Sequence, residues 1–125
     1  RMAIAEGEAR KICVTQKQFR QLLAQTQFAM AAQDVRYYLN GLLLLIEGGE
    51  LRAVATDGHR LAFASMAIEG ELPRQELILP RKTVLELNRL LSDSAAPLTM
   101  EAAPNQIRFQ SGQIQLVSRL IDGNS

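Results

Sequence analysis

The hydrophobic pattern near the start of the chain predicts an amphipathic helix. Gln18 follows Thr15 at the spacing of a capping box, which opens a helix. The next apolar positions recur at the interval of one helical face, so a helix over residues 16–32 is expected. That face comprises Phe19, Leu22, Leu23, Thr26 and Met30. The apolar segment 11–14 is too short for a helix, and a strand is expected there.

Runs of apolar and β-favouring residues then predict an antiparallel meander. Turn formers separate the runs at Gly48-Gly49 and Asp57-Gly58, and Pro73 interrupts the chain. The expected strands are 38–46, 50–56, 60–67 and 76–79.

The second half of the chain repeats this order of elements. Pro80 introduces a second helix, expected over residues 81–91, because proline is tolerated at a helix start. Its buried face is predicted to hold Val84, Leu87, Leu90 and Leu91. Further strands are expected at 98–102, 106–110 and 113–120.

Each half therefore reads as a short strand, a helix and a meander, without residue-level identity between the halves. Two amphipathic helices and an antiparallel sheet with one apolar face pack most simply as two layers. The expected fold class is α+β, with both helices side by side on one layer of sheet.

Composition fits one globular domain: 125 residues, 47% hydrophobic and 22% charged. A net charge of +1 argues against a general polyanion binder, so contacts with DNA must come from local clusters. The longest apolar run, 42–46, is too short to span a bilayer, and the first ten residues lack the apolar stretch of a signal peptide. We expect a cytoplasmic protein without membrane contact, and a chain that is a piece of something longer.

No metal or cofactor is expected. Cys13, the single cysteine, sits in an apolar patch and is predicted to be a buried structural thiol, not a zinc ligand or disulfide partner. Asp34, Asp57 and Asp93 are scattered without a histidine or cysteine partner.

One enzyme hypothesis stays open, a small hydrolase that uses Asp57 and His59. Such a pair needs the carboxylate to orient the imidazole, and a third group such as Thr56 or Ser65 within hydrogen-bond reach. No nucleophile motif or phosphate-cradling glycine loop occurs elsewhere in the chain.

Two clusters suit nucleic acid. Segment 33–38 places amide, cationic and aromatic groups together, although its tyrosines could instead close the core edge with Arg36 paired or solvated. Arg81 and Lys82 put positive charge at a helix start, where a phosphate would be stabilised. The alternative is that both side chains extend into solvent, at a cost of about 0.5 kcal/mol. A stand-alone DNA-binding domain is therefore a second alternative.

The Asp57-Gly58 turn and Leu39 on the neighbouring strand form a mixed apolar and polar set. A hairpin end that bears leucine, a threonine methyl and an imidazole can form one wall of a peptide groove. Ordinary edge packing would use the same residues.

Three strings resemble, in order and spacing, the central domain of the bacterial sliding clamp, the beta subunit of DNA polymerase III. They are QDVRYYLNG (33–41), VATDGHRLA (54–62) and PRK (80–82), and LIDG (120–123) resembles the family's exit from that domain. The resemblance covers residues 12–123, which leaves 1–11 as a linker or appended segment and 124–125 as a tail.

The resemblance implies a processivity factor of bacterial chromosomal DNA replication that does no chemistry itself; nucleotidyl transfer lies in other subunits of the holoenzyme. In the family, two subunits of three similar domains each form a ring around duplex DNA. Its groove takes short peptides of the Gln-Leu-x-Leu-Phe kind from the polymerase alpha subunit, the clamp loader and repair proteins. This chain alone is expected to be a monomer with half a groove.

The resemblance also assigns residues to both surfaces. The positions that match the peptide groove are Leu39, Thr56, Gly58, His59, Arg60 and Leu61. The positions that match the DNA-facing surface are Gln33, Tyr37, Tyr38, Arg81 and Lys82. Lys17 and Arg20, on the polar side of the first helix, are expected to add to the positive lining of the hole.

Overall fold

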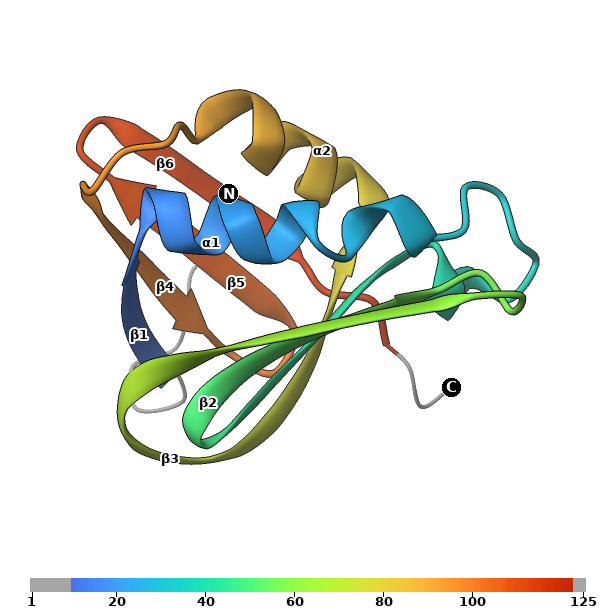
Figure 1. Ribbon diagram of the computed structural model, residues 1–125, viewed down its shortest axis with the longest axis horizontal. Helices are drawn as coiled ribbons and strands as arrows, with labels where there is room; N and C mark the ends of the chain where they lie inside the picture. Colours follow the sequence, from blue (N-terminus) through green and yellow to red (C-terminus); the bar gives the residue numbers. More distant parts are fainter. Residues whose placement is uncertain (1–9, 123–125) are drawn as a thin grey trace.

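The computed structural model describes residues 10–122 as two antiparallel sheets and two helices (Figure 1), which confirms the α+β class. Its strands are β1 (Arg10–Thr15), β2 (Gly41–Thr56), β3 (Leu61–Pro80), β4 (Pro97–Ala102), β5 (Gln106–Ser111) and β6 (Ile114–Arg119). Its α-helices are α1 (Gln16–Ala24) and α2 (Arg81–Leu90), and its 3-10 turns are η1 (Gln27–Ala29) and η2 (Tyr37–Leu39).

The first sheet joins the two ends of the described chain. Its strand order is β1-β4-β5-β6, and β1 pairs with β4 from Arg10↔Ala102 to Thr15↔Pro97. The short strand of the first half thus completes the meander of the second half.

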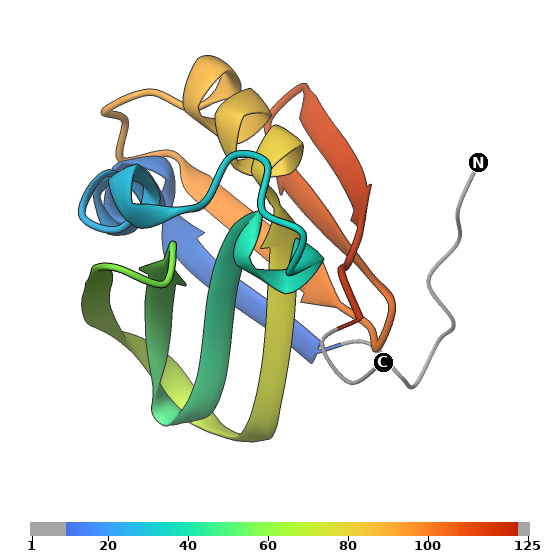
Figure 2. The ribbon, with the colours of Figure 1, turned by 90° about the vertical axis from the view of Figure 1, so that its right-hand side faces the viewer.

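The second sheet pairs the long strands β2 and β3. Residues 41–46 of β2 pair with 75–80 of β3, and residues 50–56 pair with 61–67. Between these arms the register shifts on both sides of Gly48, which has φ +59°, and both ribbons curve back at the edge farthest from the helices (Figure 2).

This arrangement corrects three expectations. The segments predicted as separate strands are arms of two longer strands, so neither Gly49 nor Pro73 ends a strand. A single sheet was expected beneath the helices, whereas the helices face two separate sheets. The strand expected from residue 38 begins at Gly41, because residues 37–39 form η2.

The capping box is confirmed, but α1 ends earlier than predicted. Thr15 Oγ1 accepts the Gln18 backbone N–H at 3.0 Å, and Gln18 Oε1 accepts that of Thr15 at 2.9 Å. At the other end, the Thr26 hydroxyl donates to the Leu22 carbonyl at 2.9 Å, and the Thr26 N–H bonds the Leu23 carbonyl. The Thr26 side chain thereby occupies the carbonyl that its own N–H would use to extend the helix.

The core lies between the two helices, which run side by side, and the sheets (Figure 1). The residues predicted for the first helical face are all buried, although Thr26 and Met30 lie beyond the end of α1. Those predicted for the second face are buried except Leu90, which is half-buried. Phe19 of α1 meets Phe109 of β5 with ring centroids 5.8 Å apart, and neither ring is exposed. Two buried polar bonds also tie helix to sheet, Gln16 to Ser111 at 2.8 Å and Thr83 to Ser118 at 2.6 Å.

The prediction of a buried Cys13 is wrong, because its thiol is exposed. Ile12 and Val14 point into the core, so strand alternation turns Cys13 to the opposite face.

The second predicted domain boundary, after residue 123, lies outside the described residues, and so does most of the first predicted segment. Of the predicted linker 1–11, only Arg10 and Lys11 are described, and both belong to β1. The tail 124–125 and Gly123 lie outside the described range. Within residues 10–122, no helix has the length and apolar character to cross a membrane.

Candidate peptide and nucleic-acid surfaces

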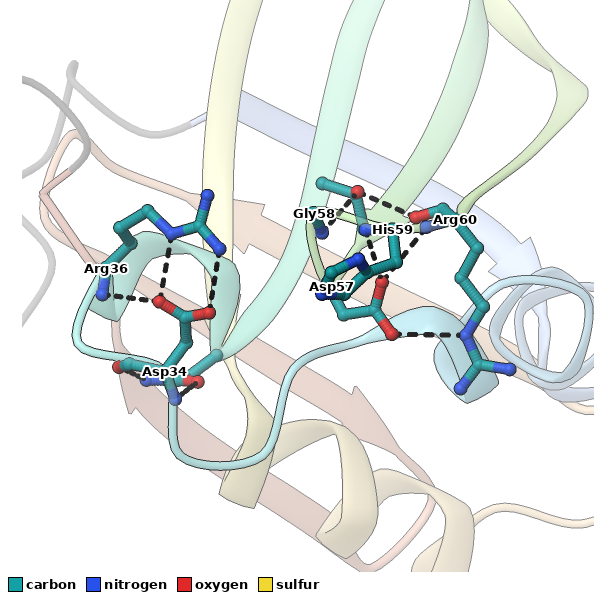
Figure 3. Close-up of polar contacts among 8 residues, drawn as sticks. Asp34, Arg36, Asp57, Gly58, His59 and Arg60 are labelled. Atoms are coloured by element: carbon teal, nitrogen blue, oxygen red, sulfur yellow. Dashed lines mark hydrogen bonds and ion pairs between the residues drawn. The ribbon is translucent and has the colours of Figure 1, made fainter.

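The turn between β2 and β3 is organised by the carboxylate of Asp57 (Figure 3). One oxygen accepts the backbone N–H groups of His59 at 2.9 Å and Arg60 at 3.0 Å, and the other accepts Arg60 Nε at 3.2 Å. The backbone bonds, chiefly the one from His59, lower the pKa of Asp57. The turn is therefore held in one shape by an ionised side chain.

Thr56 and Gly58 complete the turn. The Thr56 hydroxyl donates to the Arg60 carbonyl at 2.7 Å and accepts the Gly58 N–H at 3.1 Å. Gly58 has φ +92°, a conformation that glycine adopts without steric cost. These bonds leave the side chains of His59 and Leu61 on the surface, where Leu61 is 65% exposed.

Arg60 anchors the turn to η1. Its Nη2 donates to the Phe28 carbonyl at 2.8 Å, and its guanidinium carbon lies 5.5 Å from the centroid of the Phe28 ring. Both side chains remain more than half exposed, so the contact forms part of the outer surface.

A small pocket beside the turn joins two of the predicted groove residues. Leu39 and Thr56 line one hollow of about 200 Å³. The other lining residues are Tyr38, Gly41, Leu43, Val54 and Ile78.

The apolar floor of this pocket, Leu43, Val54 and Ile78, was not among the predicted site residues. Each alternates with buried neighbours and so faces the opposite side of the sheet. The unbroken apolar run 42–46 was a usable signal, because a strand that is apolar on both faces is expected to pack against other groups on each face.

The segment 33–40 is folded around Asp34. Its carboxylate accepts the Arg36 backbone N–H at 2.7 Å, Nε at 3.0 Å and Nη2 at 2.9 Å (Figure 3). The Asn40 side chain bonds both backbone groups of Asp34 at 2.9 Å. Arg36 is thus paired, as the structural alternative for this segment expected.

The predicted DNA-facing residues lie on the segment 33–40 and at the start of α2, and a backbone hydrogen bond joins these two elements. The Arg81 backbone N–H at the start of α2 donates to the Asn40 carbonyl at 3.0 Å, which joins the helix to the segment. The Tyr37 hydroxyl donates to the Asp122 carbonyl at 2.9 Å, and the Tyr37 and Tyr38 rings meet edge-on at 5.9 Å. Gln33 is exposed.

The positive charge at α2 has no acidic neighbour in its own first turn. Within residues 10–122, neither Arg81 nor Lys82 forms an ion pair, and Lys82 is exposed. Lys17 and Arg20 line a separate hollow of about 630 Å³, which Asn88 of α2 also lines. Arg20 Nη1 lies 3.8 Å from Asp93 Oδ1.

The hydrolase arrangement is absent from the described residues. Both Asp57 oxygens are engaged by His59 and Arg60 without the imidazole, and no hydrogen bond from the His59 ring is formed in residues 10–122. The Thr56 hydroxyl donates to a carbonyl instead. The same residues hold no group of three or more His, Cys, Asp or Glu side chains suited to a metal ion.

The Asp34–Arg36 pair is expected to persist to strongly acid pH. The Arg36 hydrogen bonds lower the pKa of Asp34 from 3.8 to about 2, so the carboxylate favours the folded form at neutral pH. Its contribution to stability is present above pH 3.8 and is lost as the pH falls through about 2. Carbon-detected NMR of the Asp34 carboxyl should show a midpoint near 2. In the Arg36→Ala variant the midpoint should return toward 3.8, and an equal midpoint in both proteins would contradict the assignment.

Comparison with known proteins gives a consistent result. Residues 13–125 match the family described as DNA polymerase III beta subunit, central domain. The beta sliding clamp of Escherichia coli (strain K12) is 51% identical over 108 residues, which are 86% of this chain and 30% of that protein. That of Pseudomonas putida (strain KT2440) is 46% identical over 123 residues, 96% of this chain and 33% of that protein.

Solved structures agree. The DNA polymerase III subunit beta from Pseudomonas aeruginosa superposes with a TM-score of 0.90 at 42% identity, covering 100% of this chain and 35% of that chain. A sliding clamp from the same organism, bound to griselimycin, superposes with a TM-score of 0.89 at 42% identity, covering 100% of this chain and 34% of that chain. This chain spans about a third of the length of these relatives.

Proposed function

This chain belongs to the bacterial sliding clamp family, as the central domain of a DNA polymerase III beta subunit, and from that premise we propose that it is the middle part of a replication processivity clamp. The complete protein is a ring of two subunits that encircles duplex DNA in the cytoplasm. The domain does no chemistry, and nucleotidyl transfer belongs to other subunits of the polymerase. Alone, this chain is a monomer with half of the peptide groove.

The proposal is supported chiefly by the pocket that lies beside the hydrogen-bonded turn. Leu39 and Thr56 line one hollow, and the bonds of Asp57 fix His59 and Leu61 at the turn beside it. A surface that is ordered before binding loses little entropy when a peptide docks. The partners are peptide segments of the polymerase alpha subunit, the clamp loader and repair proteins, held through burial of apolar side chains.

A duplex would lie along the segment 33–40 and the start of α2. Arg81 and Lys82 supply positive charge beside the tyrosines of that segment, and the backbone bond from Arg81 to Asn40 keeps the two elements together. Such contacts attract phosphates without reading sequence. A net charge of +1 suits a ring that must slide, because a strongly basic one would bind the duplex tightly.

The test of the peptide surface is an NMR amide titration of this chain with a Gln-Leu-x-Leu-Phe peptide. Shifts should cluster at Leu39 and residues 56–61, with Ser65 and the sheet beyond it unaffected. If this chain and the complete clamp are both silent, the groove assignment is wrong; silence in this chain alone would mean that the rest of the groove is indispensable. Griselimycin, which a related clamp binds, should compete with the peptide in the complete clamp.

The DNA surface makes a separate prediction. In the complete clamp, Arg81→Ala with Lys82→Ala should weaken duplex binding and flatten its salt dependence, by about one unit of slope per lost phosphate contact. Fluorescence anisotropy across a salt series measures both quantities. Lys11→Ala with Arg119→Ala removes the same charge from exposed strand positions and should leave the slope unchanged.

The same titration separates the clamp from a stand-alone DNA-binding domain. A clamp domain should bind linear duplex weakly when it is not part of a closed ring. Tight binding by this chain alone, lost steeply with salt, would favour the stand-alone domain instead.

A further inference from the structure

We propose that Arg36 is a positioning residue for the peptide surface, which holds the 57–60 turn in place against the segment that carries Leu39. The inference rests on the proposed peptide groove and extends it. Arg36 does not itself line the pocket, and its role follows from what its guanidinium contacts on each side.

On one side the guanidinium is fixed in direction. Asp34 accepts its Nε at 3.0 Å and its Nη2 at 2.9 Å, so the two planar groups meet as a fork, and the Arg36 backbone N–H bonds the same carboxylate. Paired bonds of this kind define an orientation as well as a distance. The Asn40 side chain bonds the backbone N–H and carbonyl of Asp34, so the ends of the segment that carries the Asp34–Arg36 pair are held together.

On the other side the guanidinium lies against Gly58. A Cβ atom placed on Gly58 would come within 2.8 Å of Arg36 Nη2, 3.4 Å of Nη1 and 3.5 Å of Cζ. The planar group therefore occupies the space that a side chain at position 58 would enter. Gly58 leaves this space open because it has no side chain, and its φ of +92° independently favours glycine.

These two contacts place Arg36 between the segment that carries Leu39 and the turn that follows Thr56. Leu39 follows it in the same segment, where the Leu39 N–H donates to the Arg36 carbonyl at 2.9 Å. Thr56, the last residue of β2 before the turn, lines the pocket together with Leu39. Without the guanidinium the space beside Gly58 would be open, and we expect the turn to shift relative to the segment that carries Leu39, although Asp57 and Arg60 still bond it.

An alternative is that the Asp34–Arg36 pair is an ordinary surface ion pair. Arg36 is 49% exposed, and exposed pairs contribute little to stability. The two readings differ in what they predict for the turn. An ordinary pair leaves the geometry at 57–60 unchanged when it is removed, whereas a positioning residue changes that geometry before any ligand is added.

The test compares variants of the complete clamp that carries this domain. Arg36→Ala should shift the free-state amide signals of residues 57–61 and weaken a Gln-Leu-x-Leu-Phe peptide about ten-fold. Arg36→Lys keeps the charge but not the planar fork, so it should not restore affinity. Arg74→Ala is the matched control, since Arg74 is 55% exposed and paired with Glu47 and Glu76, outside the pocket lining, and it should change neither reading.

The outcomes separate the inference from the proposed function. If the unaltered clamp does not bind the peptide, the groove assignment fails, while the free-state shifts still report on the role of Arg36. If the unaltered clamp binds and Arg36→Ala binds equally well with unshifted turn amides, the inference is wrong. Rescue by Arg36→Lys would also overturn it, because charge alone would then explain the effect.

A double-mutant cycle with Gly58→Ala tests the contact directly. Alanine at 58 is strained by the backbone conformation in any background, and it additionally meets Arg36. In the Arg36→Ala background only the first effect remains, so Gly58→Ala should perturb the turn signals less there. Equal perturbation in both backgrounds would show that the two residues do not interact.

Discussion

Replacing His59 and Leu61 together by alanine in the complete clamp should reduce peptide affinity at least about 100-fold, the combined loss of two central contacts. Both side chains are exposed, and the bonds that shape the turn are made by Asp57, Thr56 and backbone groups. Truncation therefore removes contact area without removing what holds the turn. Isothermal titration calorimetry with a Gln-Leu-x-Leu-Phe peptide measures the loss.

A thermal unfolding curve should show that this double variant is as stable as the parent. Leu85→Ala is the matched control, because Leu85 is 48% exposed on α2 and lies outside the pocket lining. It removes a comparable exposed leucine and should leave peptide affinity unchanged. Full affinity in the His59 and Leu61 double variant would mean that the turn is not the binding surface.

The second large effect concerns the core. Phe19→Ala should lower the free energy of unfolding by about 3–5 kcal/mol, the usual range for a fully buried phenylalanine. Phe19 has no exposed surface and meets Phe109 at 5.8 Å, so its loss leaves a cavity between α1 and the first sheet. Urea denaturation of this chain measures the change.

Phe63 provides the comparison for that experiment. It is 58% exposed on β3, so Phe63→Ala should change the free energy of unfolding by no more than about 0.5 kcal/mol. Similar losses for Phe19→Ala and Phe63→Ala would contradict the assignment of the core.

Local signals in the sequence predicted much of this architecture. The capping box and the helical spacing identified where α1 begins and which of its residues are buried, because those features depend on neighbours within one turn of helix. The end of α1 was missed because the Thr26 side chain bonds a helix carbonyl, and threonine is compatible with either outcome.

Features that depend on distant segments were predicted less well. Cys13 was assigned to the core from its apolar neighbours, although strand alternation alone places it on the opposite face from Ile12 and Val14. The continuity of β2 through Gly48 depends on the partner strand, which holds both arms in register.

The candidate site shows the same division. The Asp57-Gly58 turn could be found from composition, since aspartate and glycine specify turns through local bonds. The contact between Arg36 and Gly58, and the pocket floor of Leu43, Val54 and Ile78, bring together segments that are far apart in the chain. Only their placement in three dimensions reveals which of these residues lie close together.

The pairing of β1 with β4 also affects how this domain is made. Within this domain β1 is synthesised first, yet the strand that pairs with it, residues 97–102, is synthesised only after both helices and the whole second sheet. Until then Ile12 and Val14 have no sheet to join, and an unpaired strand can capture another chain. Contacts between such distant segments form slowly. We therefore expect nascent chains stopped before residue 97 to remain protease-sensitive and in need of chaperones.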